Sequence, residues 1–281
     1  MNVAVIGVGR MGAPMLSRLL SAGHQVTVLE RRSNAAASPT LAGVTRAQTL
    51  CAAVQAADVV VVVVRTDEQV QSVCLGPNGA LAHMKPQATL VQHTTSNPAT
   101  VEQIAREGAA RGIRALDAAL SGGPHDVAAG TLTLWVGGEE ADLEAVRPVL
   151  ASYAAPIVFV GAIGDGQRVK LVNNALFVAQ VGLTIDAVRL ASSLGIAEQT
   201  ILSALQHGSA ASRALSVVAR AGTVSNVAPR LADLMRKDIE VVRDVVQRSA
   251  ADLGIIGKVL ASDAVQHSVL ATIAQPELTK R

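Results

Sequence analysis

The first twelve residues constrain the fold most, because they place a glycine-rich turn directly after a short β-branched run. The run "VAVIG" predicts a strand, the apolar spacing in "RMGAPMLSRLL" predicts a helix, and "HQVTVLE" predicts a second strand. In such a βαβ unit Gly7 permits the tight turn, Gly9 lets the backbone approach a pyrophosphate, and Gly12 allows the helix to pack closely on the strand. The stretch therefore predicts a dinucleotide-binding turn, with a purely structural glycine-rich turn as the alternative.

The same alternation continues through the first half of the chain. "DVVVVVV", "ATLVQHT" and "IRALDAAL" predict further strands, and "EQVQSVCLG" and "NPATVEQIAREGAARG" predict helices between them. Strands that are apolar on both faces and separated by helices are typical of a parallel sheet covered on both sides. The first half is therefore predicted to be an α/β domain, and the length of the chain leaves room for a second domain.

Composition and charge narrow the class of partner. The 281 residues carry a formal net charge of +2, and Lys and Arg are scattered, so the sequence offers no electrostatic footprint for nucleic acid or an anionic membrane. One Trp, one Tyr and two Phe are too few for base stacking on aromatic platforms. The uncharged apolar run at residues 171–185 is shorter than the roughly 20 residues of a membrane span. A small-molecule partner is therefore expected.

Cysteine usage and the N-terminus predict a compartment. Cys51 and Cys74 lie in no CxxC motif and no Cys/His cluster, so we expect free thiols, no metal site and a reducing environment. The N-terminus lacks a basic segment followed by a long apolar one, so no secretion signal is expected. A cytoplasmic protein is predicted.

The residues after the second predicted strand give conflicting indications about the cofactor. Glu30 ends that strand and would accept a hydrogen bond from a ribose 2′-hydroxyl, which favours NAD. Arg31 and Arg32 follow at once and could hold a 2′-phosphate, which favours NADP, or could form a solvated loop. We expect NADP or NAD and lean towards NADP, because an exposed glutamate can swing aside.

A second glycine-rich stretch follows the strand at residues 113–120. Ser121, Gly122 and Gly123 offer a hydroxyl and consecutive unhindered backbone N–H groups, which could bind a substrate carboxylate. A β-turn between two strands is the alternative interpretation, since Gly-Gly and Gly-Pro are common in turns.

A lysine stands in an apolar helix of the second half. "GDGQRVKLVNNALFVAQVGLTI" predicts a long helix that starts near Gly166, with Lys170 and Asn174 on one face. A lysine in a largely buried helix is costly unless it is paired or used, and desolvation would make it a proton donor and acceptor near neutral pH. The alternative is a lysine at the first turn whose ammonium reaches solvent.

Four motifs, taken in order, resemble the β-hydroxyacid dehydrogenase family across nearly the whole chain. "VIGVGRMGAPM" resembles the family's cofactor loop, "TTSNP" its nucleotide-contacting segment, "DAALSGGPHDVAAGTLTLWVGG" its substrate-binding signature and "GDGQRVKLVNN" its catalytic signature. 3-Hydroxyisobutyrate dehydrogenase and 2-hydroxy-3-oxopropionate reductase typify the family. The resemblance implies NAD(P)-dependent interconversion of a small β-hydroxy acid and its semialdehyde or oxo acid by hydride transfer, without a metal.

The resemblance also implies roles for residues at matching positions. Lys170 would be the general acid/base, and Asn174 would hold the lysine and the substrate in register. The substrate carboxylate would be bound by Ser121, Gly122 and Gly123. The residues expected at the cofactor, by this resemblance or by the reasoning above, are Gly7, Gly9, Arg10, Met11, Gly12, Glu30, Arg31, Arg32, Thr95 and Lys237. Lys237 taken alone could equally be a solvated surface lysine.

The family's architecture is expected as well. It implies an N-terminal Rossmann parallel-sheet domain, residues 1–163, and an all-helical C-terminal domain, residues 164–281, joined by the long helix that carries the lysine. The site is expected in the cleft between the domains, at the carboxyl ends of the strands. The resemblance implies that the helical domain helps to bind the substrate. A helical domain of this size also has limited internal core, so we expect it to pair with a second copy in a homodimer or homotetramer.

Two departures from the family put the choice of substrate in doubt. Arg65-Thr66-Asp67 stands where a short apolar pair is usual, and His93 stands where a smaller or acidic residue is expected. Arg65 and His93 are therefore candidates for selecting an unusual substrate.

Two other functions stay open. An imine reductase would share the fold and the glycine motifs but usually has another proton donor in place of the lysine, so Lys170 argues against it, while Asp186 leaves room for imine reduction as a side activity. A non-catalytic NADP-binding interaction module would tend to have lost the lysine, whereas Lys170, Asn174 and Ser121 occur together here.

Overall fold

The computed structural model describes residues 1–29 and 42–270, so Glu30, Arg31 and Arg32 lie outside the described residues. The chain divides into two compact units, Met1–Lys170 and Leu171–Arg281, and the division falls inside one long helix. Each unit has hydrophobic core of its own.

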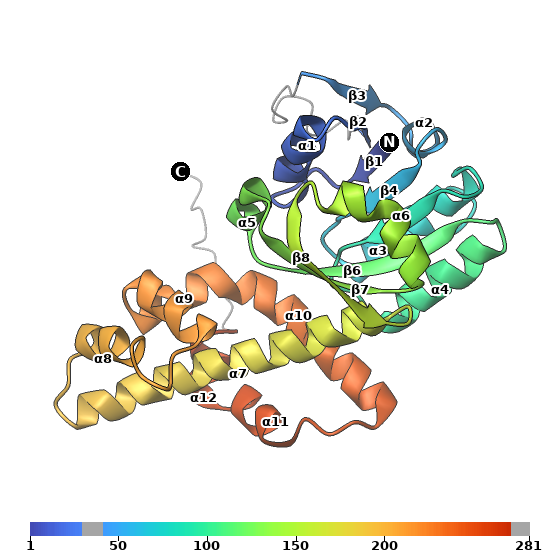
Figure 1. Ribbon diagram of the computed structural model, residues 1–281. Coiled ribbons are helices and arrows are strands. Elements are labelled where there is room, and N and C mark those ends of the chain that lie inside the picture. The colour runs from blue at the N-terminus through green and yellow to red at the C-terminus, as the bar shows by residue number, and fades with distance from the viewer. Residues whose placement is uncertain (30–41, 271–281) are drawn as a thin grey trace, which may run out of the picture. The chain divides into compact units, whose positions relative to one another are not determined.

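The first unit is built on one eight-stranded sheet in the order β3-β2-β1-β4-β5-β6-β7-β8 (Figure 1). The strands are β1 (Asn2–Ile6), β2 (Gln25–Leu29), β3 (Val44–Ala47), β4 (Val59–Val62), β5 (Thr89–Gln92), β6 (Arg114–Ser121), β7 (Leu132–Gly137) and β8 (Ala154–Gly161). All pairings up to β6 are parallel, as predicted. β7 is antiparallel to β6, because the connection over residues 122–131 is shorter than the dozen or more residues of a parallel crossover. The sheet is therefore mixed rather than wholly parallel.

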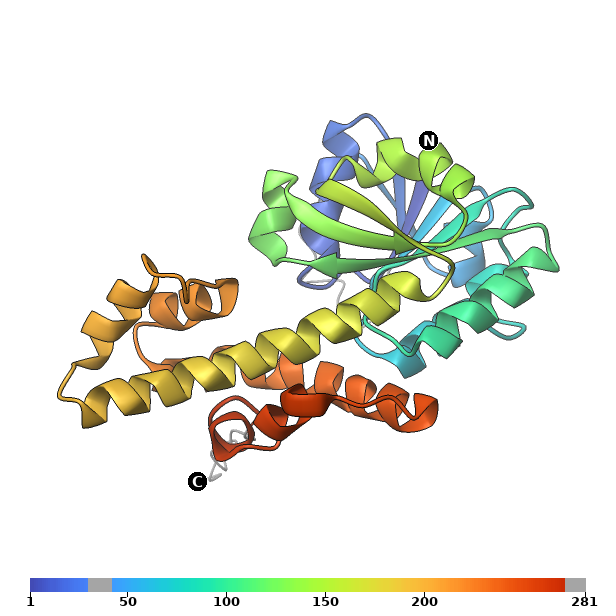
Figure 2. The ribbon, with the colours of Figure 1, turned by 60° about the horizontal axis from the view of Figure 1, so that its bottom comes forward.

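Helices cover both faces of this sheet (Figure 2). One core contains side chains from α1 (Gly12–Ser21), α5 (Pro124–Ala129) and α6 (Glu140–Leu150), and the other contains side chains from α2 (Leu50–Val54), α3 (Asp67–Cys74) and α4 (Pro98–Ala109).

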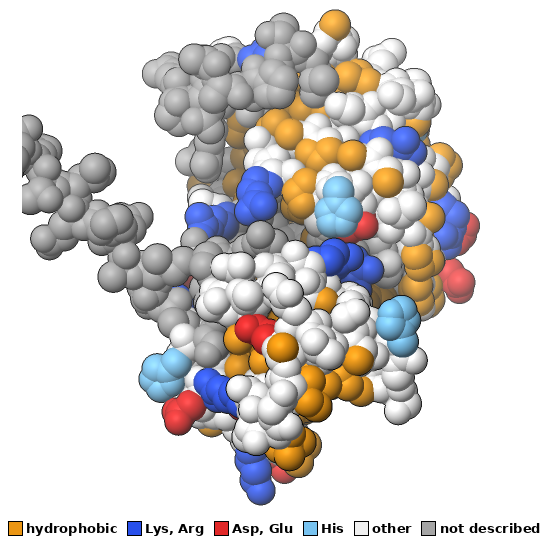
Figure 3. All heavy atoms as spheres, turned by 90° about the vertical axis from the view of Figure 1, so that its left-hand side faces the viewer, with side chains coloured by type: hydrophobic (Ala, Val, Ile, Leu, Met, Phe, Trp, Pro, Cys, Tyr) orange, Lys and Arg blue, Asp and Glu red, His pale blue; other side chains and the backbone are white. Residues whose placement is uncertain are grey.

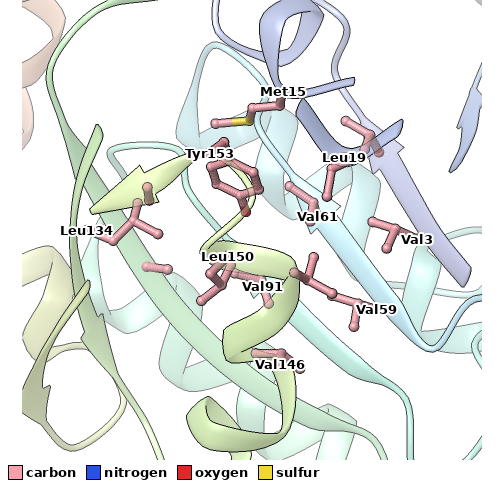
Figure 4. Close-up of a cluster of buried hydrophobic side chains, with 14 of the residues drawn as sticks. Val3, Met15, Leu19, Val59, Val61, Val91, Leu134, Val146, Leu150 and Tyr153 are labelled. Atoms are coloured by element: carbon pink, nitrogen blue, oxygen red, sulfur yellow. The ribbon is translucent and has the colours of Figure 1, made fainter. Parts of the chain in front are cut away.

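The strand period of two sends alternate side chains of β4 into the two cores. Val59 and Val61 lie in the core with α1 and α6, while Val60 and Val62 lie in the other. Figure 4 shows Val61 beside Leu19, with Val59 and Tyr153 in the same cluster. The uniformly apolar run that predicted a doubly covered strand is thus explained.

The second unit is helical. Its helices are the greater part of α7 (Asp165–Ser193), α8 (Glu198–Leu205), α9 (Arg213–Ala221), α10 (Ala228–Ser249), α11 (Gly254–Leu260) and α12 (Asp263–Ser268). α7 supplies the core of this unit with Val178, Val181 and Ile185. By length and composition α7 could cross a membrane, yet half of its most apolar window is buried inside the protein, which is usual for a core helix.

His93, after β5, is enclosed in the core of the first unit. Its Nδ1 lies 2.5 Å from the carbonyl oxygen of Ala118 and its Nε2 lies 2.9 Å from the hydroxyl of Tyr153. The carbonyl can only accept, so Nδ1 carries the proton and Nε2 accepts from Tyr153. This arrangement corrects the interpretation of His93 as a substrate-selecting residue, because its ring is 1% exposed and both nitrogens are used.

Burial lowers the pKa of His93 to about 4, from an ordinary value of 6.5. As the pH falls below 6.5 the unfolded chain binds the proton first, so the stability that neutral His93 contributes is fully present above that pH and is lost progressively towards about pH 4.

Replacing His93 by leucine and Tyr153 by phenylalanine removes the titrating ring and its hydroxyl partner together. We expect the wild type to lose ~2 kcal/mol more unfolding free energy than H93L/Y153F between about pH 6.5 and about pH 4.5. Urea unfolding followed by the fluorescence of Trp135, the single tryptophan of the chain, measures this in the first unit. Equal acid losses in the two proteins would show that His93 does not carry the effect.

Candidate cofactor and catalytic site

Most of the expected site residues of the first unit follow four neighbouring strands. The glycine turn comes after β1, residues 63–66 after β4, residues 93–97 after β5, and Ser121 ends β6. Because β1, β4, β5 and β6 are consecutive parallel strands in the sheet, their carboxyl ends lie along one edge. In open α/β sheets ligands bind at this edge.

Two of the three motif glycines are required by the fold. Gly7 has a φ of +108°, and a Cβ there would overlap the backbone carbonyl of Val63. A Cβ on Gly12 would overlap the carbonyl oxygen of Gly7, so close packing of α1 on the turn needs glycine at position 12.

Gly9 is different, because a Cβ there would meet no described residue within 4 Å and its φ is not in the left-handed region. Residues 1–29 and 42–270 therefore leave open space beside this backbone. Met11, the cap of α1, supplies no side-chain hydrogen bond to the first-turn amides. Open space beside a helix N-terminus suits a pyrophosphate, so the turn fits a dinucleotide.

The other predicted residues of the turn differ in environment. Arg10 is exposed, whereas Met11 is half-buried and packs against the core with α1. An expected cofactor contact of Arg10 would use a solvent-facing side chain, and one of Met11 would use its backbone or the edge of the core.

Residues 93–97 are tied to the neighbouring loop. Thr94 donates from Oγ1 to the carbonyl of Val64 at 3.0 Å, and Asn97 caps α4 by accepting from the amide of Ala99 at 3.0 Å. Thr95, expected near the nicotinamide ribose, lies half-buried between these two anchored residues.

Two residues of the Arg65-Thr66-Asp67 segment after β4 have structural roles. Thr66 caps α3, and the Asp67 carboxylate accepts from Thr100 Oγ1 at 2.9 Å and from the Asn97 amide at 3.3 Å. Burial raises the pKa of Asp67. Arg65 is exposed, so its side chain alone remains free to select a substrate or cofactor.

The Ser121-Gly122-Gly123 loop offers an anion fewer hydrogen-bond donors than the sequence predicted. Asp126, on α5, accepts the Gly123 amide at 2.7 Å, and a Cβ on Gly122 would press against the same carboxylate oxygen. The Gly123 donor is thus used inside the loop. Ser121 and Gly122 stay as the candidates for binding a substrate carboxylate.

The start of α7 is held by a buried carboxylate that sequence reasoning missed. Asp117, on β6, accepts two hydrogen bonds from backbone amides. Its Oδ1 accepts from Gly164 and its Oδ2 from Gln167, both at 2.7 Å. Burial raises the pKa of Asp117 to about 6, against the lowering effect of these two bonds. The sequence could have indicated Asp117, because it is an aspartate inside the apolar run "RALDAALS". Buried acids are rare unless they are paired or hydrogen-bonded.

Lys170 follows on the first turns of α7 and is half-buried. It belongs to the first unit, and Asn174, one turn later, belongs to the second. Asn174 is 2% exposed, donates from Nδ2 to Asp238 Oδ2 at 2.6 Å, and accepts from Asn173 Nδ2 at 3.1 Å.

Asp238 is a second residue that sequence reasoning missed. It is 2% exposed, and its Oδ1 lies 2.9 Å from Nζ of Lys237. The structure therefore links Lys237, expected at the cofactor, to Asn174 through one buried carboxylate. The adjacent Lys-Asp pair in "RKDIE" was the only signal for it.

Comparison with known proteins agrees with these features. Residues 2–161 match the family model described as the NAD binding domain of 6-phosphogluconate dehydrogenase, and residues 164–267 match the model described as NAD-binding of NADP-dependent 3-hydroxyisobutyrate dehydrogenase. The NAD-dependent L-serine dehydrogenase of Pseudomonas aeruginosa is 33% identical over 258 residues, which cover 89% of this chain and 87% of that protein. The chain belongs to the β-hydroxyacid dehydrogenase family.

Solved structures support the same family. The Mycobacterium tuberculosis 3-hydroxyisobutyrate dehydrogenase, solved with L-serine, superposes with a TM-score of 0.82 at 29% identity and covers 92% of this chain and 90% of its own. The Streptomyces aurantiacus imine reductase superposes with a TM-score of 0.67 at 20% identity, with 92% and 90% coverage, which shows a shared fold alone. This family member is an NAD(P)-dependent oxidoreductase of the dehydrogenase type, and both NAD and NADP fit the matched families.

The open space at Gly9 gives a direct test of the cofactor turn. Gly9→Ala should weaken NAD(P) binding by about tenfold or more, since each tenfold corresponds to about 1.4 kcal/mol and the methyl would stand where the pyrophosphate approaches. The melting temperature should stay unchanged, because the described part of the chain leaves that space empty. Calorimetric titration and thermal unfolding measure the two quantities.

Gly12→Ala is the matched control, since its Cβ overlaps Gly7 and should lower the melting temperature. A folded Gly9→Ala protein with wild-type cofactor affinity would place the pyrophosphate elsewhere.

Proposed function

We propose that this dehydrogenase interconverts a small β-hydroxy acid and its semialdehyde or oxo acid, with Lys170 as the general acid/base. The observation that carries the proposal is the attachment of the lysine's helix turn to β6. Asp117 of β6 binds the first turn of α7, and the same strand ends at Ser121. One strand thus holds both the expected proton-transfer group and the expected carboxylate-binding loop.

The chemistry divides between the cofactor and the chain. The bound nicotinamide supplies the hydride acceptor or donor, as in other enzymes that use it. In oxidation, neutral Lys170 Nζ takes the proton of the substrate hydroxyl, and in reduction its ammonium returns a proton to the carbonyl oxygen. Ser121 Oγ and the Gly122 N–H bind the carboxylate, which orients the carbon that exchanges hydride.

Asn174 and Lys237 have supporting parts in this proposal. The bond from Asn174 to Asp238 fixes the amide of Asn174 on the face of α7 that also carries Lys170. Lys237 would contact the cofactor while Asp238 limits its orientation.

The relatives' names suggest the substrates to try first. One relative is named for L-serine and another, from Pseudomonas aeruginosa, for 3-hydroxyisobutyrate. Both acids carry a primary hydroxyl on the carbon β to the carboxylate, which is the arrangement that Lys170 and Ser121 would bind. Glycerate shares it, and tartronate semialdehyde carries the corresponding aldehyde on that carbon. We propose NADP ahead of NAD on the strength of Arg31 and Arg32 alone.

The imine reductase alternative finds less support. Asp186 lies on the exposed side of α7 and pairs with Arg189 at 3.0 Å, so it is engaged at the surface. The likeness to imine reductases concerns the fold, and the family models that match are those of hydroxyacid dehydrogenases.

We also propose a homodimer or homotetramer formed through α7. Hydrophobic side chains reach the surface of the helical unit (Figure 3). Large apolar residues on α7 are 44–66% exposed and recur at steps of four and seven residues, which returns them to nearly the same face of a helix. They are Val172, Leu176, Leu183 and Leu190. A stripe of this kind is covered most simply by the same stripe of a second copy.

A cytoplasmic location belongs to the same proposal. Both cysteines are free thiols in the structure, with Cys74 buried, as suits a reducing compartment.

Lys170→Ala tests the assignment of the proton-transfer group. Turnover should fall about 10²-fold or more, with cofactor affinity kept, because general acid–base catalysis typically contributes 10²–10⁴-fold. The absorbance of the reduced nicotinamide, followed with NAD and NADP and with L-serine, 3-hydroxyisobutyrate and glycerate, measures it. Lys258→Ala, at an exposed position of α11, is the control that should keep full activity. Undiminished turnover without Lys170 would defeat the mechanism.

The α7 stripe predicts the oligomeric state. Leu183→Glu with Leu190→Glu should convert the oligomer to a monomer at micromolar concentration, because charges would have to be buried in the interface. Sedimentation velocity measures this. Ile255→Glu, which changes an exposed apolar residue of α11, should leave the oligomer intact. A wild-type monomer would count against the proposal.

A further inference from the structure

One glutamine on α7 contacts the backbone on both sides of Thr95. Gln167 is fully buried, its Oε1 accepts the amide of Ser96 at 3.0 Å, and its Nε2 donates to the carbonyl of Thr94 at 3.1 Å. These are the peptide groups that follow and precede Thr95. The backbone partners also fix which end of the amide is oxygen, because Ser96 N–H can only donate and Thr94 C=O can only accept.

A second glutamine completes this buried network. Gln92, at the end of β5, accepts from Gln167 Nε2 at 2.9 Å and donates to the Thr94 carbonyl at 2.8 Å and to Ser96 Oγ at 3.3 Å. Gln92 and Ser96 are at most 1% exposed. Every polar atom of the Gln167 amide thus has a partner within the protein, which makes the arrangement specific and hard to displace.

The backbone of Gln167 is held as firmly as its side chain. Its amide donates to Asp117 Oδ2, and a Cβ on Gly166 or on Gly137 would come within 3 Å of an oxygen of that carboxylate. Glycines at these two positions leave room for the buried acid. Gln167 is therefore anchored to β6 by its main chain and to residues 94–96 by its side chain.

We propose that Gln167 is a positioning residue that fixes the distance between Lys170 and the segment carrying Thr95. Lys170 lies three residues after Gln167, on the next turn of the same helix. This inference rests on the proposed function, in which Lys170 transfers the proton and Thr95 lies at the nicotinamide ribose. Hydride and proton move in one reaction. A shift of Lys170 or of the segment carrying Thr95 by about 1 Å would therefore slow the reaction by about 10²-fold.

An exposed ion pair on the same turn provides a contrast. Arg168 is half exposed, and it contacts Glu102 of α4 at 2.6 Å and Asp165 at 3.0 Å. Exposed pairs of this kind contribute little to structure. If many weak contacts together held this helix turn in place, loss of the Arg168 ion pairs would displace Lys170 as much as loss of the Gln167 side-chain hydrogen bonds.

The first experiment measures hydride transfer per cofactor-binding site in a single turnover. Gln167→Met keeps the length of the side chain and removes its hydrogen bonds, and we expect a fall of about 10–10²-fold in the rate per site. Gln167→Glu keeps an acceptor for the Ser96 amide, and its rate per site should lie between those of the wild type and Gln167→Met. Arg168→Gln and the core variant Leu143→Ala should stay within about threefold of wild type, because a residue that only supports folding changes the number of sites and not the rate at each. A wild-type rate per site in Gln167→Met would overturn the proposal.

The second experiment needs no turnover. Hydrogen exchange followed by mass spectrometry should show the amides of residues 94–97 and 164–170 exchanging about tenfold faster in Gln167→Met than in Arg168→Gln. Unchanged exchange in both segments would overturn the coupling. If the wild type turns over none of the hydroxy acids, the proposed function fails, and the exchange result still decides whether Gln167 couples the two segments.

Discussion

The carboxylate of Asp117 determines where α7 begins, and the expected chemistry depends on where α7 begins. Two backbone amides of the first turn of the helix converge on this buried group. A helix N-terminus leaves its first amides without partners inside the helix, so a carboxylate from the sheet satisfies them and fixes the helix to the strand at once. Lys170 then has a defined place relative to β6, whichever way the second unit is arranged.

Charge at Asp117 has a cost in stability. Its pKa in the folded chain, about 6, lies above the ordinary 3.8, so the contribution that Asp117 makes to stability is present at low pH and is lost as the pH rises through about 6. At neutral pH the protein therefore keeps an ionised buried acid at the expense of folding free energy. An apolar residue would stabilise the sheet at this position but would leave the amides of Gly164 and Gln167 unpaired.

Much of the first unit was predictable because its signals are local. The β-branched runs, the glycines at 7, 9 and 12, and the helical run after Gly166 each follow from spacing and backbone conformation within a few residues. Long-range partners were not predictable. His93 is a core residue because Tyr153, sixty positions away, gives its ring a hydrogen bond. The Gly123 amide is occupied because Asp126 turns back towards it. The antiparallel β7 follows from the shortness of one connection, which a pattern of alternating strands and helices does not reveal.

The three motif glycines show how structure separates two demands that look the same in sequence. Gly7 and Gly12 are glycines because the chain itself occupies the space where a Cβ would be. Gly9 has open space around it among the residues that the structure describes, so none of these residues requires glycine there. A motif residue that the fold does not need is evidence for a ligand, whereas a motif residue that the fold does need is evidence only for the turn. By this reasoning Gly9 is the glycine that supports our proposal of a dinucleotide site at the turn after β1. Gln167 is a related case, because its buried amide binds the backbone on both sides of Thr95, which α7 does not need in order to form.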